Sequence, residues 1–245
     1  MSVEVRRSSD AEALARAVAD GLVALLASAQ AEGRVPEVAL TGGTIAEAVY
    51  REVASIGDSA VDWSRVDLWW GDERFVPAGS EDRNDAAVRK VLLDVIGTDP
   101  ARVHPMPAAD EAHHDAAAAA SSYGREVRGS GGGRFDLVLL GMGPDGHVAS
   151  LFPGFPQLSV DDEIAVAVAD SPKPPPERIT LTFPALNRTR EVWFLVSGEG
   201  KAEAVARALA ADGSVAETPA RGISCERTVW WLDESAASAL AEASG

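Results

Sequence analysis

The chain has 245 residues, of which 46% are hydrophobic, enough apolar material to close the core of one sizeable α/β domain. Acidic residues outnumber basic residues by 38 to 22, and the resulting net charge of −16 argues against a nucleic-acid partner. The one cysteine, Cys225, has no partner for an internal disulfide, and no segment reaches the roughly 18 apolar residues of a membrane span. We therefore expect a cytoplasmic protein with no membrane partner, whose oligomeric state the sequence leaves open.

Strands and helices are predicted to alternate along the chain. Apolar residues recur at helical spacing in six segments, which are 11–31, 45–56, 84–96, 108–127, 200–211 and 235–243. Short apolar runs bounded by turn residues predict strands at 36–40, 66–70, 135–140, 163–169, 191–196 and 228–232. This order predicts a single domain, 1–245, with a doubly wound, mainly parallel sheet flanked by helices. Ligands of such sheets bind beyond the carboxyl ends of the strands.

A glycine loop joins the first predicted strand to the next helix. It reads Thr41-Gly42-Gly43-Thr44. Glycines at such a point let backbone N–H groups approach a ligand, and the N-terminus of the following helix favours a negative charge. A phosphate cradle and a tight turn capped by Thr44 are equally good interpretations of this loop alone.

A second glycine-rich loop follows the strand at 135–140. Its letters, Gly-Met-Gly-Pro-Asp-Gly, match a dinucleotide-binding fingerprint, but Pro153 and Pro156 stop the long helix that this fingerprint requires. The loop places Asp145 and His147 two residues apart at a strand end, with glycines that allow close access. We interpret this pair as a candidate site for acid–base chemistry.

Four basic residues lie near the ends of predicted elements and can bind an anionic ligand. They are Arg74, Arg178, Lys201 and Arg221. Each taken singly is as well explained by a solvated surface position. Histidines and acids at 111–115 are interpreted as a solvated helix face, so no metal site is expected.

Four segments together resemble the 6-phosphogluconolactonase family, within the wider glucosamine-6-phosphate isomerase/6-phosphogluconolactonase group. These segments are 40–44, 70–77 with Ser80 and Asn84, 141–154 with its Asp-Gly-His-Val-Ala-Ser-Leu-Phe-Pro stretch, and 175–187. The resemblance implies a fold of the sugar-phosphate isomerase type, similar to ribose-5-phosphate isomerase and CoA transferases. It also implies hydrolysis of 6-phospho-D-glucono-1,5-lactone in the oxidative pentose phosphate pathway, without a metal or organic cofactor.

The resemblance also implies roles for individual residues. The family's general base corresponds to His147 and its neighbouring acid to Asp145. The family's ligand-binding basic positions correspond to Arg74 and Lys201. By the same resemblance, Arg178 and Arg221 are also expected to bind the ligand. Threonines at 41 and 44 replace the serines that are common in the family, which keeps both hydroxyl groups.

The chemistry of the residues agrees with lactone hydrolysis. A lactone needs only a positioned water, a base and donors that face the developing oxyanion. A histidine, whose ordinary pKa is about 6.5, suits the role of base, and the glycine loop with Lys201 suits the phosphate.

Two alternatives remain, a related enzyme and a protein without catalytic activity. One is an aminosugar-phosphate deaminase, which by resemblance carries Ala-Phe-Asn-Glu-Pro after Asp-Gly-His, whereas this chain has Val-Ala-Ser-Leu-Phe-Pro. The other is a non-catalytic phosphosugar sensor. Such a sensor would need a DNA-binding module or a partner domain, and the single helix expected before residue 36 leaves no room for a DNA-binding module.

Overall fold

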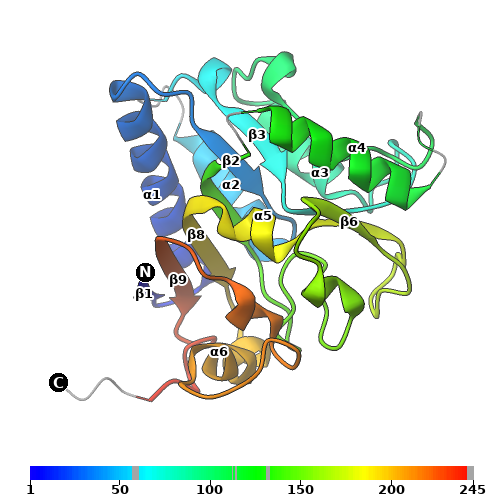
Figure 1. Ribbon diagram of the computed structural model, residues 1–245. Helices are drawn as coiled ribbons and strands as arrows, with labels where there is room; N and C mark the ends of the chain where they lie inside the picture. The colour runs from blue at the N-terminus through cyan, green and yellow to red at the C-terminus, as the bar shows by residue number, and fades with distance from the viewer. Residues whose placement is uncertain (57–60, 112, 114, 131–132, 242–245) are drawn as a thin grey trace.

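The computed structural model describes residues 1–56, 61–111, 113, 115–130 and 133–241. A six-stranded, fully parallel sheet forms its centre, in the order β1-β9-β8-β5-β2-β3 (Figure 1). The strands are β1 (Ser2–Ser8), β2 (Glu37–Leu40), β3 (Asp67–Trp70), β5 (Phe135–Leu140), β8 (Thr189–Val196) and β9 (Arg227–Asp233). The predicted mainly parallel α/β sheet is confirmed.

A second, antiparallel sheet was not anticipated. Its order is β4-β7-β6, formed by β4 (Asp72–Arg74), β7 (Arg178–Leu181) and β6 (Ala165–Val168). No strand is expected from the sequence between 70 and 84, because β4 is only three residues long and entirely charged. In the β4–β7 register, Arg74 lies opposite Arg178, so this sheet brings two predicted binding residues together.

Helices flank both sheets. They are α1 (Ala11–Ala31), α2 (Thr44–Ser55), α3 (Asn84–Val88), α4 (Ala116–Gly129), α5 (Phe183–Asn187) and α6 (Ala202–Leu209). Helices α1 and α2 pack against each other, and α4 packs on β6 and β7. The carboxyl ends of β8 and β9 point toward α6 (Figure 1). No helix in the described part of the chain is long and apolar enough to cross a membrane.

Tryptophans on two strands of the parallel sheet, β3 and β9, belong to the hydrophobic core. Trp69 and Trp70 on β3 are fully buried, and Trp230 and Trp231 on β9 nearly so. The Trp230 ring stacks on Phe194 of β8, with 3.8 Å between ring centroids. These side chains therefore serve packing of the core.

The N-terminal strand β1 was missed because its sequence mixes valines with charged residues. It forms an edge strand that pairs only with β9 among the described strands. Helix α4 begins later than predicted, at Ala116, because the Asp115 side chain accepts the N–H of Ala118 at 2.7 Å and caps the helix there.

Two other helix predictions were wrong in part. The helix expected over 84–96 is shorter, because Asn84 begins the five-residue α3, which continues into a π-helical turn at Arg89–Leu93. The helix expected at 235–243 is replaced by turns over 234–239, and residues 242–245 lie outside the described residues.

Candidate active site

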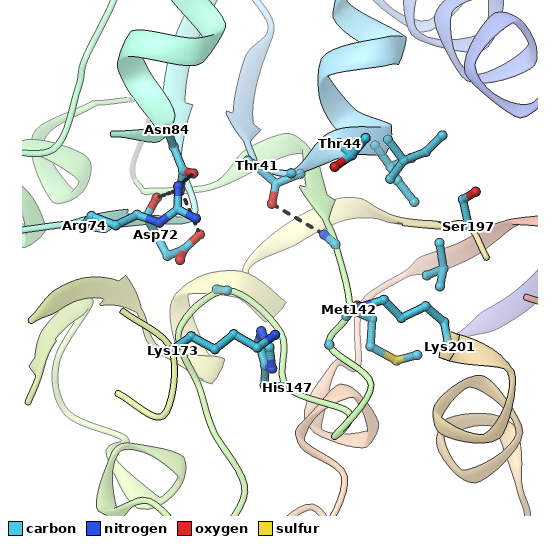
Figure 2. A pocket seen from close by; sticks show the side chains of 18 of the residues that line it. Thr41, Thr44, Asp72, Arg74, Asn84, Met142, His147, Lys173, Ser197 and Lys201 are labelled. Atoms are coloured by element: carbon cyan, nitrogen blue, oxygen red, sulfur yellow. Dashed lines mark hydrogen bonds between the residues drawn. The ribbon is translucent and has the colours of Figure 1, made fainter. Parts of the chain in front are cut away.

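A cleft of about 560 Å³ opens at the carboxyl ends of β2, β5 and β8 (Figure 2). The three strands are neighbours in the sheet, so the loops that follow them meet at this edge. Most of the predicted site residues line this cleft, namely Thr41, Gly42, Gly43, Thr44, Arg74, His147, Arg178 and Lys201. The fold therefore gathers residues that are up to 160 positions apart in the sequence.

The glycine loop ends at an uncapped helix N-terminus. Gly43 is the N-cap of α2 and has a φ of 108°, a conformation that favours glycine, and no side chain hydrogen-bonds to this helix end. The Tyr50 hydroxyl accepts the N–H of Thr41 at 3.1 Å and donates to the Thr41 carbonyl at 2.9 Å, which fixes the start of the loop. The loop thus presents backbone donors and a helix N-terminus to the cleft, the arrangement that binds anions.

Asp145 and His147 form a hydrogen-bonded pair at the end of β5. The Asp145 Oδ1 lies 2.5 Å from Nδ1 of His147, whose ring packs against Phe152 at 4.7 Å between centroids. Burial alone would raise the pKa of Asp145, but its hydrogen bond and ion pair with His147 prevail and lower the pKa to about 2. An ionised Asp145 holds the proton on Nδ1, which leaves Nε2 of His147 as the proton acceptor.

Gly143 makes this pair possible. A Cβ at this position would lie 2.1 Å from both Cε1 and Nδ1 of His147 and 2.3 Å from Oδ1 of Asp145. Real side-chain carbons do not approach other atoms so closely. Gly143, the second glycine of the fingerprint-like loop, therefore leaves the space that the side chains of Asp145 and His147 occupy.

Arg74, Asn84 and Asp72 form a polar wall of the cleft (Figure 2). The Arg74 guanidinium donates to the Asn84 side-chain oxygen and, at 3.1 Å, to the Asp82 carbonyl. The Asn84 amide donates to the Asp72 carbonyl at 2.9 Å, and the Ser150 hydroxyl donates to the Asp72 carboxylate at 2.7 Å. Neighbouring donors and acceptors of this kind can bind the hydroxyl groups of a sugar.

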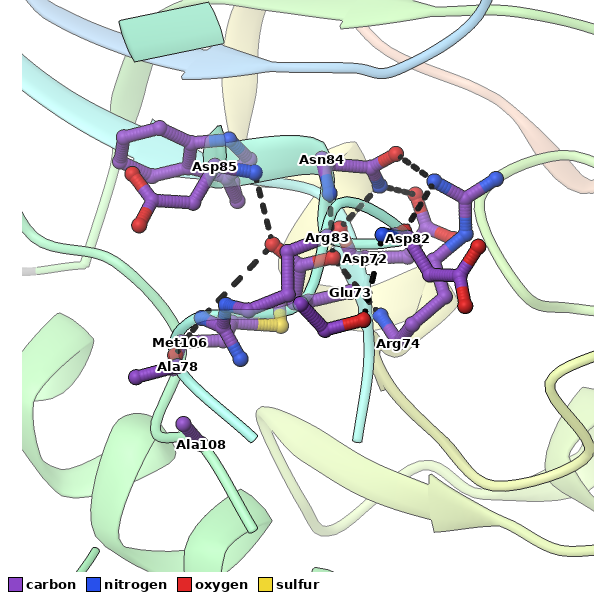
Figure 3. A network of polar contacts seen from close by, with 12 residues as sticks. Asp72, Glu73, Arg74, Ala78, Asp82, Arg83, Asn84, Asp85, Met106 and Ala108 are labelled. Carbon is purple, nitrogen blue, oxygen red and sulfur yellow. Dashed lines mark hydrogen bonds and ion pairs between the residues drawn. The ribbon is translucent and has the colours of Figure 1, made fainter. Parts of the chain in front are cut away.

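A buried carboxylate supports that wall from behind (Figure 3). Glu73 is fully buried and accepts the backbone N–H groups of Arg74, Asn84 and Asp85 at 2.7 to 2.8 Å. Its ion-pair partner is Arg83, at 3.7 Å, which also donates to the Met106 carbonyl at 2.6 Å. Burial raises the pKa of Glu73, although Arg83 and the three N–H groups act in the opposite direction. The pair joins β4 to the start of α3, which places Arg74 and Asn84 side by side.

Lys201 lies on the opposite side of the cleft, just after β8. Its ammonium donates to the Met142 carbonyl at 2.7 Å. Burial lowers the pKa of Lys201, and the charge of Lys173 lowers it further, while Asp145 acts to raise it. Figure 2 shows Lys201 on the same side of the cleft as Thr44 and Ser197.

Two of the predicted basic residues have their guanidinium groups engaged with backbone carbonyls. Arg178 lines the cleft but is 5% exposed and donates to the carbonyls of Lys173, Pro174 and Pro175 at 2.8 to 3.2 Å. Arg221 lies outside the cleft lining and donates to four carbonyls at the C-terminal end of α6, at 2.7 to 3.3 Å. We therefore leave Arg221 out of the proposed binding residues, because its donors cap a helix.

Lys173, Asn84 and Ser197 also line the cleft and were not among the sequence candidates. The sequence associates Asn84 only with the family resemblance and with no binding role, and Lys173 lies in a proline-rich segment that gives no sign of a site. A count of lysines would have drawn attention to Lys173, since the chain has very few.

Two of the residues at 111–115 that were considered for a metal site bond to the backbone instead. Asp115 caps α4, Glu111 accepts the N–H of Ala108 at 3.1 Å, and His114 lies outside the described residues. Among the residues that the structure describes, no three His, Cys, Asp or Glu side chains are grouped to hold a metal ion. The absence of a metal requirement stays a prediction.

Comparisons with known proteins agree on one family. A family model described as glucosamine-6-phosphate isomerases/6-phosphogluconolactonase matches residues 9–231. The 6-phosphogluconolactonase of Streptomyces coelicolor is 44% identical over 240 residues, covering 94% of this chain and 92% of that protein. The 6-phosphogluconolactonase of Mycobacterium leprae is 42% identical over 246 residues, covering 98% of this chain and 99% of that protein. The crystal structure of 6-phosphogluconolactonase from Thermotoga maritima has a TM-score of 0.82 at 28% identity, covering 95% of this chain and all of that one.

Proposed function

The chain belongs to the glucosamine-6-phosphate isomerase/6-phosphogluconolactonase family, and we propose from this premise that it hydrolyses 6-phospho-D-glucono-1,5-lactone to 6-phosphogluconate. The observation that carries the proposal is the Asp145–His147 pair, whose histidine lines the same cleft as the uncapped N-terminus of α2. A base and an anion site in one cleft suit an ester that carries a phosphate.

In the proposed mechanism, His147 is the general base. Its Nε2 takes a proton from water as the water oxygen bonds to the lactone carbonyl carbon, and the carbonyl π electrons move to oxygen. When the tetrahedral intermediate collapses, the bond from C1 to the ring oxygen breaks and the imidazolium returns its proton to that oxygen. The products are a carboxylic acid, which ionises, and a free hydroxyl. Asp145 keeps the ring oriented and stabilises its protonated form.

The remaining residues are proposed to bind the substrate. The N–H groups of the glycine loop, the hydroxyls of Thr41 and Thr44, and Lys201 hold the phosphate, which fixes the lactone carbon near His147. Arg74, with Asn84 and Asp72, binds at the sugar end. No cofactor or nucleic-acid partner is part of the proposal, and we place the enzyme in the cytoplasm as a single domain, 1–245.

A direct test compares freshly prepared 6-phosphogluconolactone with unphosphorylated gluconolactone, after subtraction of spontaneous hydrolysis. We expect the phosphorylated lactone to be strongly preferred. Because a hydrogen bond to a charged group contributes about 1.5 to 3 kcal/mol, Lys201→Ala should reduce kcat/KM for it by roughly ten- to a hundredfold. The same change should scarcely affect the unphosphorylated lactone, and Lys90→Ala, at an exposed lysine outside the cleft, is the matched control. Absence of lactonase activity in the folded wild type would overturn the proposal.

A further inference from the structure

The distribution of lysines in this chain is uneven. Only three of the 22 basic residues are lysines, at positions 90, 173 and 201, and two of the three line the cleft. A lysine differs from an arginine in presenting a compact charge with three rotatable donors on a flexible stem. The cleft therefore concentrates a kind of cation that the rest of the chain almost lacks.

Lys173 and Lys201 occupy different parts of the cleft (Figure 2). The Lys201 ammonium is bonded to the Met142 carbonyl, whereas the Lys173 side chain extends toward His147 and its ammonium has no hydrogen-bond acceptor among the described residues. The charge of Lys173 also contributes to the lowered pKa of Lys201, so the two ammonium groups act within one electrostatic field. Lys173 thus keeps its donors available at the reacting end of the cleft.

A buried arginine holds the loop that carries Lys173. The Arg178 Nε donates to the Pro175 carbonyl at 2.8 Å, and its Nη2 donates to the carbonyls of Lys173 at 2.9 Å and Pro174 at 3.2 Å. The Ser171 hydroxyl adds a bond to the Lys173 carbonyl at 3.0 Å. These bonds fix the backbone of Lys173 and leave only its side chain free to adjust.

We propose that Lys173 stabilises the oxyanion that forms on the lactone carbonyl oxygen, and that Arg178 is the positioning residue that holds Lys173 at the reacting end. The proposal rests on the lactonase function proposed above. As water adds to the carbonyl carbon and His147 takes its proton, negative charge develops on the carbonyl oxygen. The Lys173 ammonium faces that charge and keeps its own proton throughout. When the ring C–O bond breaks, the charge returns to the carbonyl.

The first experiment separates this role from phosphate binding. Lys173→Met, Lys173→Arg and the control Lys90→Met are assayed with both the phosphorylated and the unphosphorylated lactone. Loss of one oxyanion donor lowers turnover by up to about 10²- to 10³-fold in an enclosed site, and for this exposed lysine we expect about 10- to 100-fold. For Lys173→Met, the fall should appear in kcat, with KM little changed, and should be equal for the two lactones. Lys173→Arg, which keeps the charge, should recover part of the loss.

Each result has a distinct meaning. A loss confined to the phosphorylated lactone would overturn the proposal, because it would make Lys173 a second phosphate ligand. Activity within a few-fold of the wild type would overturn it as well. The proposed function itself is judged separately, by the activity of the wild type and of Lys90→Met.

The second experiment is a double-mutant cycle for Arg178. If Arg178 acts through Lys173, then Arg178→Lys and Arg178→Met should lower kcat in the wild type but have little further effect in Lys173→Met. Circular dichroism and thermal unfolding show which variants fold, and Arg178→Lys, the milder change, supplies the cycle if Arg178→Met does not fold. Additive losses would show that Arg178 does not work through Lys173.

Discussion

The catalytic pair can be disturbed without changing either of its members, through Gly143. In Gly143→Ala, the new methyl carbon would lie 2.1 Å from Cε1 and Nδ1 of His147 and 2.3 Å from Oδ1 of Asp145. Gly143 does not have a positive φ, so alanine fits its backbone conformation. The effect of the substitution therefore falls on the Asp–His pair.

The size of the effect follows from these distances. Carbon atoms in contact are about 3.5 to 4.0 Å apart, so the imidazole must move by more than about 1 Å. Such a movement breaks the 2.5 Å hydrogen bond between Asp145 and His147. Because a misplacement of about 1 Å can cost 10²-fold in rate, we expect kcat to fall by at least about 10²-fold. Overpacking should lower the free energy of unfolding by about 1 to 3 kcal/mol.

The assay measures kcat and KM with fresh 6-phosphogluconolactone, together with denaturant unfolding. Gly71→Ala is the matched control, because this buried glycine also follows a strand, yet its Cβ would meet the nearest atom at 3.6 Å. In a His147→Ala background the main clash is removed, so Gly143→Ala should cost little further activity. A folded Gly143→Ala enzyme with activity within a few-fold of wild type would show that catalysis does not depend on the hydrogen bond between Asp145 and His147.

Three further predictions concern the charged groups. Asp145→Asn should lower kcat by about 10²-fold or more, because an amide can donate to Nδ1 and select the unproductive tautomer, as measured with the same lactone assay. Arg83→Met leaves the Glu73 carboxylate buried and unpaired, and urea unfolding at pH 7 should show a loss of about 3 to 5 kcal/mol. Since burial raises the pKa of Glu73, this loss should shrink as pH falls and the carboxyl is protonated; a loss independent of pH would contradict it. Burial and the charge of Lys173 lower the pKa of Lys201 from its usual 10.5. As pH rises, the affinity for 6-phosphogluconate measured by calorimetry should therefore begin to fall before pH 10.5 is reached, because Lys201 loses its proton. Lys173→Met should move this fall to higher pH.

Much of the site could be predicted from sequence because its key features are local. The glycine loop and the pair Asp145–His147 each lie within a few residues of a strand end, and parallel strands carry such ends to one edge. The parallel sheet was predictable for a similar reason, because strands that helices cover on both faces appear in the sequence as short, nearly continuous apolar runs.

The remainder depends on contacts between distant segments. The antiparallel sheet was missed because β4 is short and charged, and its pairing with β7 is visible only in three dimensions. Arg178 and Arg221 look alike in sequence, yet one holds the loop of Lys173 and the other caps α6. Arg178 binds carbonyls three to five residues before it and Arg221 binds carbonyls ten to fourteen residues before it, and the residue pattern around neither arginine indicates these bonds.

The role of His147 as the base is tested by comparing the turnover of 6-phosphogluconolactone by His147→Ala with that of the wild type, with spontaneous hydrolysis subtracted and folding checked by thermal unfolding. We expect the wild type to be active and the folded variant to lose about 10²- to 10⁴-fold in kcat, the range expected for a general base. A folded His147→Ala enzyme that turns over the lactone within a few-fold of the wild-type rate would contradict the assignment of His147 as the base.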